Sequence, residues 1–176
     1  MRWPFFLISG LLIGGVLHIV SLLAVPVVAP RDAYTRLQEI GGENVAFLLD
    51  PGGPGKSLPF LDPAFAYAAC RFNLSEGPVR LRLPLAGAYV SMSFHDRDGT
   101  AFFSLNDRSA LGTVLDVEMR DEADEASKAL PLGAGTIAVT APGPIGFVLM
   151  RAFSPWPSAS SAIGEELAKT VCAPRA

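Results

Sequence analysis

Two short polar segments, residues 95–99 and 106–109, hold the residue types that could act chemically on a substrate. They read His-Asp-Arg-Asp-Gly and Asn-Asp-Arg-Ser, and a hairpin of short, twisted strands could bring them together. An imidazole oriented by a carboxylate can then act as a general base on a nearby hydroxyl. This would suit a hydrolase or a carbohydrate- or lipid-binding domain, with these candidate ligand-binding residues: His95, Asp96, Asp107 and Arg108. The same residues are also typical of a tight turn with an Arg–Asp network, so we assign no catalytic residue.

Metal binding finds little support in these segments. Asp96 and Asp98 could hold Ca²⁺, but the loop is too short for the twelve-residue calcium pattern and further ligands are not identified. Zinc would need more ligands, and His95 is the only histidine that follows the apolar N-terminal segment. We therefore predict no metal and no cofactor.

A glycine-rich stretch at residues 52–57 looks like the end of a phosphate-binding loop but departs from that pattern. The pattern requires a glycine five residues before Gly55, where the chain has Asp50. Pro59 also falls where the helix that holds the phosphates must begin. The stretch therefore predicts an exposed loop rather than a nucleotide site.

The two cysteines, Cys70 and Cys172, both follow the apolar N-terminal segment. They do not form a CxxC redox motif, and the ligands that would complete a zinc site are lacking. A structural disulfide in an oxidising compartment is the best interpretation, and we expect it to tie the C-terminal helix to the first long strand. Closing a loop of this length stabilises a fold by roughly 4–5 kcal/mol on the chain-entropy model.

The elements that position these residues are mostly short strands. Residues 79–83 alternate apolar and polar side chains with period two, which indicates a half-buried strand. Residues 96–99 predict the hairpin turn between strands at 89–94 and 101–105. We expect further strands at 46–49, 66–74, 114–119, 136–140 and 147–153. We also expect a helix at 32–40 and a surface loop or one helical turn at 121–128. A last helix should be capped by Ser158 or Ser160 and end between Leu167 and Val171. The pattern is that of a mainly β, β-sandwich-like antiparallel domain with an N-terminal transmembrane helix and a C-terminal helix.

The N-terminal segment from Phe5 to Val28 is almost wholly apolar, and no formal charge lies between Arg2 and Arg31. About twenty apolar residues in a helix span a hydrocarbon core of about 30 Å. A cleavable signal peptide is the alternative, but the run is long for one, and Pro30 follows the best small-residue cleavage site. We expect an uncleaved single-pass anchor in a bacterial inner membrane, with its N-terminus in the cytoplasm and the domain in the periplasm. The lipid bilayer is then one partner.

One face of this helix carries a pattern of small and polar residues: Gly10, Gly14, His18 and Ser21. Small residues four positions apart let two membrane helices approach closely. An imidazole at membrane depth is costly without a partner, so it indicates a functional contact. Glycines are also common in membrane helices generally, which is the simpler alternative.

Charge and length limit the class of partner and the division of the chain into domains. The formal net charge is -3 and the isoelectric point is about 5.3, which argues against nucleic acid as the main partner. We divide the chain into a transmembrane anchor with its flanks (1–30), a connector with a short helix and a Gly/Pro loop (31–60) and a periplasmic β-sandwich-like domain (61–176).

Five stretches carry a family pattern: DPAFAY at 62–67, CRFNLSEGPV at 70–79, YVSMSF at 89–94, DRDG at 96–99 and FSLNDR at 103–108. Together they resemble the domain-of-unknown-function 1254 family of bacterial envelope proteins. Phe72 departs from the family pattern, where a tyrosine is expected. The resemblance implies a β-sandwich and a companion in the same membrane, because longer relatives fuse this domain to a second β-rich domain, the domain of unknown function 1214. It implies no established reaction.

Two functional hypotheses follow. In the first, the chain is a non-enzymatic, membrane-anchored periplasmic protein that pairs with a companion anchored β-domain protein in cell-envelope assembly or integrity. In the second, it is a periplasmic hydrolase or a carbohydrate- or lipid-binding domain that uses the polar cluster around His95. A cleft that gathers the four candidate residues would favour the second hypothesis, and a solvated turn would remove its basis.

Overall fold

The computed structural model describes residues 2–28, 32–50, 58–85 and 87–175. It contains two compact units, Met1–Asp32 and Ala33–Ala176. The glycine-rich stretch at 52–57 lies outside the described residues.

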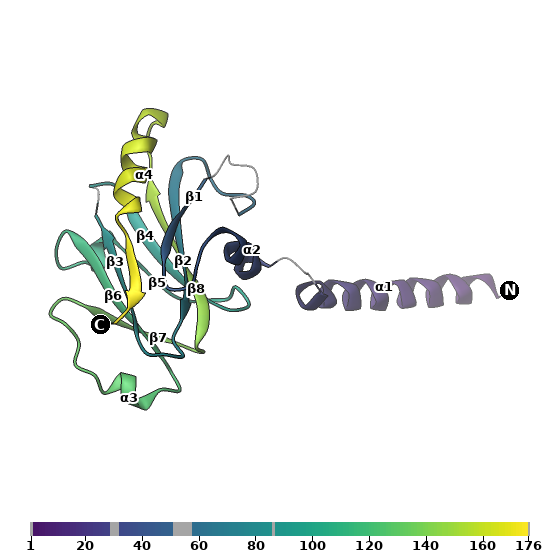
Figure 1. Ribbon diagram of the computed structural model, residues 1–176. Coiled ribbons are helices and arrows are strands. Elements are labelled where there is room, and N and C mark those ends of the chain that lie inside the picture. Colours follow the sequence, from purple (N-terminus) through teal and green to yellow (C-terminus); the bar gives the residue numbers. More distant parts are fainter. Residues whose placement is uncertain (1, 29–31, 51–57, 86, 176) are drawn as a thin grey trace. The chain divides into compact units, whose positions relative to one another are not determined.

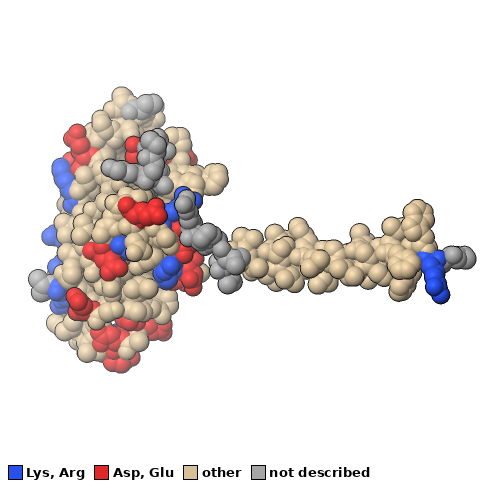
Figure 2. Space-filling model, turned by 45° about the vertical axis from the view of Figure 1, so that its right-hand side comes forward, with Lys and Arg blue, Asp and Glu red and all other residues tan. Residues whose placement is uncertain are grey.

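The first unit is the helix α1 (Trp3–Val28). Its stretch Trp3–Val25 has a mean hydropathy of 2.3, and none of it is buried. Figure 2 shows the helix as a rod without charged side chains, except for basic atoms near one end. At 1.5 Å per residue it is long enough to cross a bilayer, and it has the composition of an anchor or a signal sequence.

The second unit consists of two sheets packed as a sandwich, which confirms the predicted mainly β class (Figure 1). The larger sheet has the strand order β1 (Ala46–Leu49), β2 (Phe65–Asn73), β8 (Ile145–Phe153), β4 (Val90–Asp96), β5 (Ala101–Asn106). The smaller sheet has the order β7 (Ile137–Ala141), β6 (Val114–Asp121), β3 (Val79–Pro84), β9 (Val171–Pro174). The helices of this unit are α2 (Ala33–Ile40), α3 (Glu125–Lys128) and α4 (Ser160–Ala168), with 3₁₀ turns at Asp107–Ser109 and Pro157–Ala159.

The core lies between the two sheets and follows the period-two pattern of the sequence. Every second residue of β3 is fully buried, and β4 turns Val90, Met92 and Phe94 inward in the same way. Ile163 and Leu167 of α4 add to this core. The alternation therefore places the intervening residues of β4 and β8 on the outer face of the larger sheet.

A second apolar cluster lies on that outer face, where α2 packs. Tyr34 and Leu37 of α2 are buried against Tyr67, Ala69 and Phe147 of β2 and β8. The stretch expected as a connector therefore contributes α2 and β1 to the compact unit. This cluster does not extend over the outer surface of β4 and β5.

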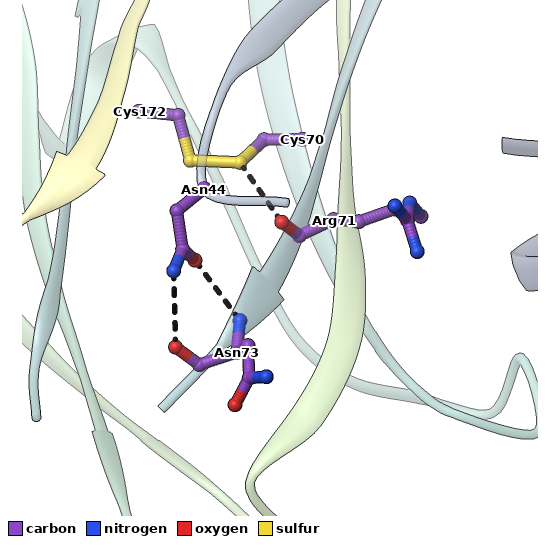
Figure 3. Close-up of a disulfide and its surroundings, with 5 residues drawn as sticks. All are labelled: Asn44, Cys70, Arg71, Asn73 and Cys172. Carbon is purple, nitrogen blue, oxygen red and sulfur yellow. Dashed lines mark hydrogen bonds between the residues drawn. A yellow bond between two sulfur atoms is a disulfide. The ribbon is translucent and has the colours of Figure 1, made fainter. Parts of the chain in front are cut away.

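The turn between α2 and β1 is fastened to β2 by side chains. Asn44 has a φ of 56°, and its carboxamide accepts a hydrogen bond from Asn73 N (2.9 Å) and donates one to Asn73 O (3.2 Å), as Figure 3 shows. Arg71, which is buried, donates to Gly41 O at 3.2 Å and lies 3.6 Å from a carboxylate oxygen of Glu43. The Arg71 guanidinium also lies 5.3 Å from the centre of the Tyr34 ring, a cation–π contact that holds α2 against the sheet.

The cysteines form a disulfide, as predicted (Figure 3). The expected location of Cys172 was wrong, because Cys172 lies in strand β9 and not in the C-terminal helix. Since Cys70 belongs to β2, the bond joins the two sheets of the sandwich.

The C-terminal helix ends at Ala168, within the expected range, but it has no serine cap. Ala159 occupies the N-cap position without a side-chain hydrogen bond, because a 3₁₀ turn leads directly into α4. The hydroxyl of Thr170 donates to Leu167 O at 2.6 Å and closes the last turn. The chain then pairs with β3, with Cys172 opposite Leu81, which satisfies backbone groups that a longer helix would leave at an unpaired sheet edge.

One strand pair departs from the expected antiparallel arrangement, since β6 and β7 are parallel. Parallel neighbours need a long crossover, and residues 122–136, which include α3, provide it. The predicted turn of helix within residues 121–128 is therefore confirmed as α3, capped by the Asp124 carboxylate, which accepts from Ala126 N and Ser127 N.

Candidate functional site

The four candidate residues from the polar segments lie at opposite ends of the β4–β5 hairpin. His95 pairs with Ala101 at the first residue of β5, whereas Ser91 pairs with Asn106 at its last residue. The 3₁₀ turn that holds Asp107 and Arg108 follows Asn106. Five residue steps along a strand cover roughly 17 Å, so the hairpin does not bring these residues into one cluster.

His95 is held in place by three contacts. Its Nδ1 lies 3.1 Å from Gly99 O, its Nε2 lies 3.0 Å from Ser93 Oγ, and its ring stacks on Phe147 at a centroid distance of 4.8 Å. Because a carbonyl oxygen only accepts, Nδ1 donates to Gly99 O, while Nε2 contacts the Ser93 hydroxyl, which itself donates to Leu149 O at 3.3 Å. Both ring nitrogens are therefore engaged with the hairpin itself.

Asp96 and Asn106 shape the turns on which they lie. One carboxylate oxygen of Asp96 accepts from Asp98 N (3.0 Å) and Thr100 N (2.8 Å), and Gly99 supplies the positive φ of 88° that the predicted turn requires. Asn106 Oδ1 accepts from Arg108 N at 3.1 Å and caps the 3₁₀ turn. In the part of the chain that the structure describes, no group of three His, Cys, Asp or Glu side chains could hold a metal ion.

Between the two ends of the hairpin, the outer surface of β4, β5 and β8 contains a pocket of about 230 Å³. Met92 and Leu105 form part of its lining, and the aromatic Tyr89 lines it as well. Its other polar lining residues are Ser91, Ser93, Ser104, Asn106, Ser109 and Arg151. We refer to this cavity as the serine–arginine pocket.

The strand register places Arg151 in this pocket. Arg151 of β8 lies directly opposite Ser91 of β4, and its Nε donates to the Ser91 hydroxyl at 2.7 Å. On its other side the guanidinium carbon lies 5.9 Å from the centre of the Phe65 ring. Hydrogen bonding and the aromatic contact together fix the position of this positive charge.

Sequence reasoning found the two ends of the hairpin but missed the pocket between them. The polar side chains come from three strands that are far apart in the sequence, and each alternates with core residues. The available signal was an arginine inside the apolar strand 145–153 and the Ser-Met-Ser alternation at 91–93. Neither indicates a pocket until β8 is known to pair with β4.

The smaller sheet carries a second set of charged residues, and these pair with one another. Arg80 donates to Asp116 through Nε (2.9 Å) and Nη2 (2.7 Å), and this hydrogen bonding raises the pKa of Arg80 above its usual value. Glu118 and Arg120, both buried, form an ion pair that Arg175 joins at 3.0 Å. These charged side chains therefore pair with one another within the fold. Figure 2 likewise shows acidic and basic side chains interspersed on the face in view.

In the first unit, the residues of the predicted partner face are all accessible along α1. A Cβ built at Gly10 or Gly14 would meet no atom within 4 Å. The Ser21 hydroxyl donates to His18 O at 2.8 Å, a bond within the helix that satisfies this polar group in an apolar segment. The face therefore remains open to another helix.

A similar fold occurs within a longer protein of known structure. The VPA0106 protein from Vibrio parahaemolyticus is similar with a TM-score of 0.60 and 10% identity, over 80% of this chain and 32% of that one. An uncharacterized protein from Burkholderia cenocepacia matches with a TM-score of 0.46 and 12% identity, over 65% of this chain and 32% of that one. This chain thus spans about a third of the length of each.

No curated protein matches the chain. The sequence profile of the family described as "Protein of unknown function (DUF1254)" matches residues 61–174. This match begins just before β2 and ends with β9, so it includes both sheets except β1. The chain therefore belongs to the DUF1254 family.

Proposed function

We propose that this protein is a single-pass, inner-membrane-anchored periplasmic subunit that pairs with a companion anchored β-domain protein in cell-envelope assembly or integrity. In this proposal α1 is an uncleaved anchor with its N-terminus in the cytoplasm. The sandwich acts by association and has no catalytic role of its own.

The observation that carries the proposal is the partial coverage of the Vibrio structure. This fold accounts for 32% of that longer chain, so there it occurs together with about twice its own length of further protein. A separate chain that binds to the fold can supply an equivalent neighbour. The resemblance described above points to a β-rich domain as that neighbour.

Two features of this chain support the membrane location. The helix α1 has the length and hydropathy of a membrane span. The Cys70–Cys172 disulfide is typical of a compartment outside the cytoplasm. The open glycine face of α1 would allow a second helix to pack closely, and a common membrane raises the local concentration of two anchored partners.

The test is affinity capture of the tagged full-length protein from its own membranes in mild detergent, with mass spectrometry of the captured chains. We compare the wild type with Gly10→Leu/Gly14→Leu, which fills the glycine face. Gly15→Leu is the matched control, because Gly15 is turned by roughly 100° from Gly14 and is equally free of contacts. The expected result is an anchored β-domain protein captured by the wild type and by Gly15→Leu, but lost from the double variant.

The other outcomes are equally informative. If the companion is captured by all three forms, pairing stands and the role of the glycine face is wrong. If no anchored β-domain protein is captured by the wild type, the proposal of a companion fails. If the mature protein lacks residues 1–28, the helix is a cleaved signal and the anchor is wrong.

A further inference from the structure

The serine–arginine pocket has the composition of a site for a negatively charged ligand. Among the described residues no acidic side chain lines it, and its polar groups are hydroxyls, one carboxamide and one guanidinium. Such a set donates hydrogen bonds to oxygen atoms and supplies one positive charge. A cation would find no charged ligand among the lining residues.

Arg151 differs from the arginines that serve the fold. Five others on or next to strands each have a carboxylate within 4.0 Å: Arg71, Arg80, Arg82, Arg120 and Arg175. Among the described residues Arg151 has no such carboxylate, and its one hydrogen bond runs through Nε to the buried Ser91. Its two terminal NH₂ groups are thus positioned but not used, in the geometry that binds a carboxylate or phosphate in a bidentate manner.

The pocket also contains hydrogen-bond donors that are not used within the described part of the fold. Asn106 Oδ1 accepts from Arg108 N, which orients the carboxamide and leaves its NH₂ group as a donor. The hydroxyls of Ser104 and Ser109 make no hydrogen bond to any described residue, although both side chains line the pocket. These three groups can bind the hydroxyls of a ligand whose anion is held by Arg151.

The size of the pocket limits the ligand. Its volume of about 230 Å³ is below the roughly 300–1,000 Å³ of pockets for drug-sized molecules. Tyr89, which is partly exposed, adds an aromatic surface to the lining, against which the carbon skeleton of a sugar ring can pack. A single sugar unit fits these limits better than a chain of units or a lipid tail.

We propose that the serine–arginine pocket binds a single sugar unit that carries a carboxylate or phosphate group. Arg151 pairs with the anion, and Ser104, Asn106 and Ser109 bind the ring hydroxyls. This inference is independent of the proposed companion, because the pocket is built from residues of one chain.

The test is a titration of the ¹⁵N-labelled full-length protein in detergent micelles, followed by NMR. The probes are glucuronate, glucose 6-phosphate, uncharged glucose and inorganic phosphate. We expect saturable shifts at the amides of Ser91, Ser104 and Asn106 and at the Arg151 Nε–H with at least one of the charged sugars. Glucose should bind about tenfold more weakly or worse, because it lacks the charge-assisted hydrogen bonds.

Two variants separate a built site from general attraction to positive charge. Arg151→Gln should weaken binding of the charged sugar by about tenfold or more. Arg108→Gln removes an exposed arginine that follows the same hairpin but does not line the pocket, so it should bind as the wild type does. Ser104→Ala, at an exposed position, tests the pocket without risk to the fold, and dispersed spectra confirm folding of each variant.

Several results would overturn the proposal. Absence of saturable shifts with both charged sugars would remove it, as would equal loss of binding in Arg151→Gln and Arg108→Gln. Inorganic phosphate that binds as tightly as the charged sugars would show a bare oxyanion site and contradict the role of the ring hydroxyls. Preference between glucuronate and glucose 6-phosphate then decides which anion the ligand carries.

Discussion

At the scale of single residues, the buried charges of the smaller sheet explain how its parallel strand is held. Arg120 donates to the Glu118 carboxylate and to two backbone oxygens of the crossover, Lys128 O and Leu130 O, each at 2.8 Å. Arg175 donates to Glu118 and to Pro131 O at 2.9 Å. The network therefore fastens residues 122–136 to β6, which sets β7 beside β6 in the parallel direction.

Removal of Arg120 should be costly because it leaves a buried carboxylate with only one cationic partner. We expect Arg120→Met to lower the free energy of unfolding by about 3 kcal/mol, measured by urea unfolding of the full-length protein in detergent. The double variant Arg120→Met/Glu118→Leu should recover part of this loss, because no unpaired charge remains buried.

The matched control for this prediction is Arg82→Met. Arg82 also pairs with a carboxylate, Asp116 at 3.4 Å, but its side chain is 54% exposed. Its loss should change the free energy of unfolding by less than about 1 kcal/mol. An equal effect of Arg82→Met and Arg120→Met would contradict the role given to burial.

At the scale of elements, strand β8 organises the larger sheet. It pairs with both β2 and β4, and its Gly146 lies opposite Phe72 of β2 and Asp96 of β4. A Cβ at this position would lie 2.3 Å from His95 O and 2.5 Å from an atom of the Phe72 ring. Glycine is therefore required here by a close approach of backbone and core side chain.

The substitution Gly146→Ala should destabilise the fold by about 2 kcal/mol, because the ring and the neighbouring strand must move apart. Gly143→Ala, in the turn before β8, is the control, since a Cβ there would meet no atom within 4 Å. We expect Gly143→Ala to change the free energy of unfolding by less than about 0.5 kcal/mol. The measurement is again urea unfolding, and similar values for the two variants would refute the steric argument.

At the scale of the whole molecule, the disulfide is the covalent link between the sheets. Its two cysteines are 102 positions apart, and both are buried. On the chain-entropy model a loop of this length contributes roughly 4–5 kcal/mol. Its position next to the Asn44–Asn73 contacts means that β9, β2 and the start of β1 are fastened in one region (Figure 3).

Reduction of the disulfide should lower the free energy of unfolding by about 4 kcal/mol. The measurement compares the full-length protein with and without a phosphine reductant in urea unfolding. Cys70→Ala/Cys172→Ala should unfold near the midpoint of the reduced wild type and should not respond to the reductant. A reduced wild type as stable as the oxidised one would show that the link adds nothing to the packing of the two sheets.

Much of the secondary structure could be predicted because it depends on local patterns. The alternation at 79–83 and the Asp96–Gly99 turn each fix the backbone of their own neighbourhood, and both are confirmed. The short edge strand β9 was missed, because its extended form depends on pairing with β3, which lies some ninety positions earlier. The parallel direction of β7 likewise depends on the buried charges that hold the crossover.

The candidate site shows even more clearly which features local sequence patterns predict and which only the tertiary structure decides. Residue types and spacing were sufficient for the strands other than β9, the hairpin, the apolar helix, the disulfide and the family. Only the tertiary structure separated His95 from Asp107 along β5 and placed Arg151 opposite Ser91, sixty positions away. Local patterns decide which residues are extended and which face they occupy. The order of strands in a sheet depends instead on which long-range pairing buries the most apolar surface and satisfies the backbone hydrogen bonds. That pairing is a property of the whole chain and not of any local segment.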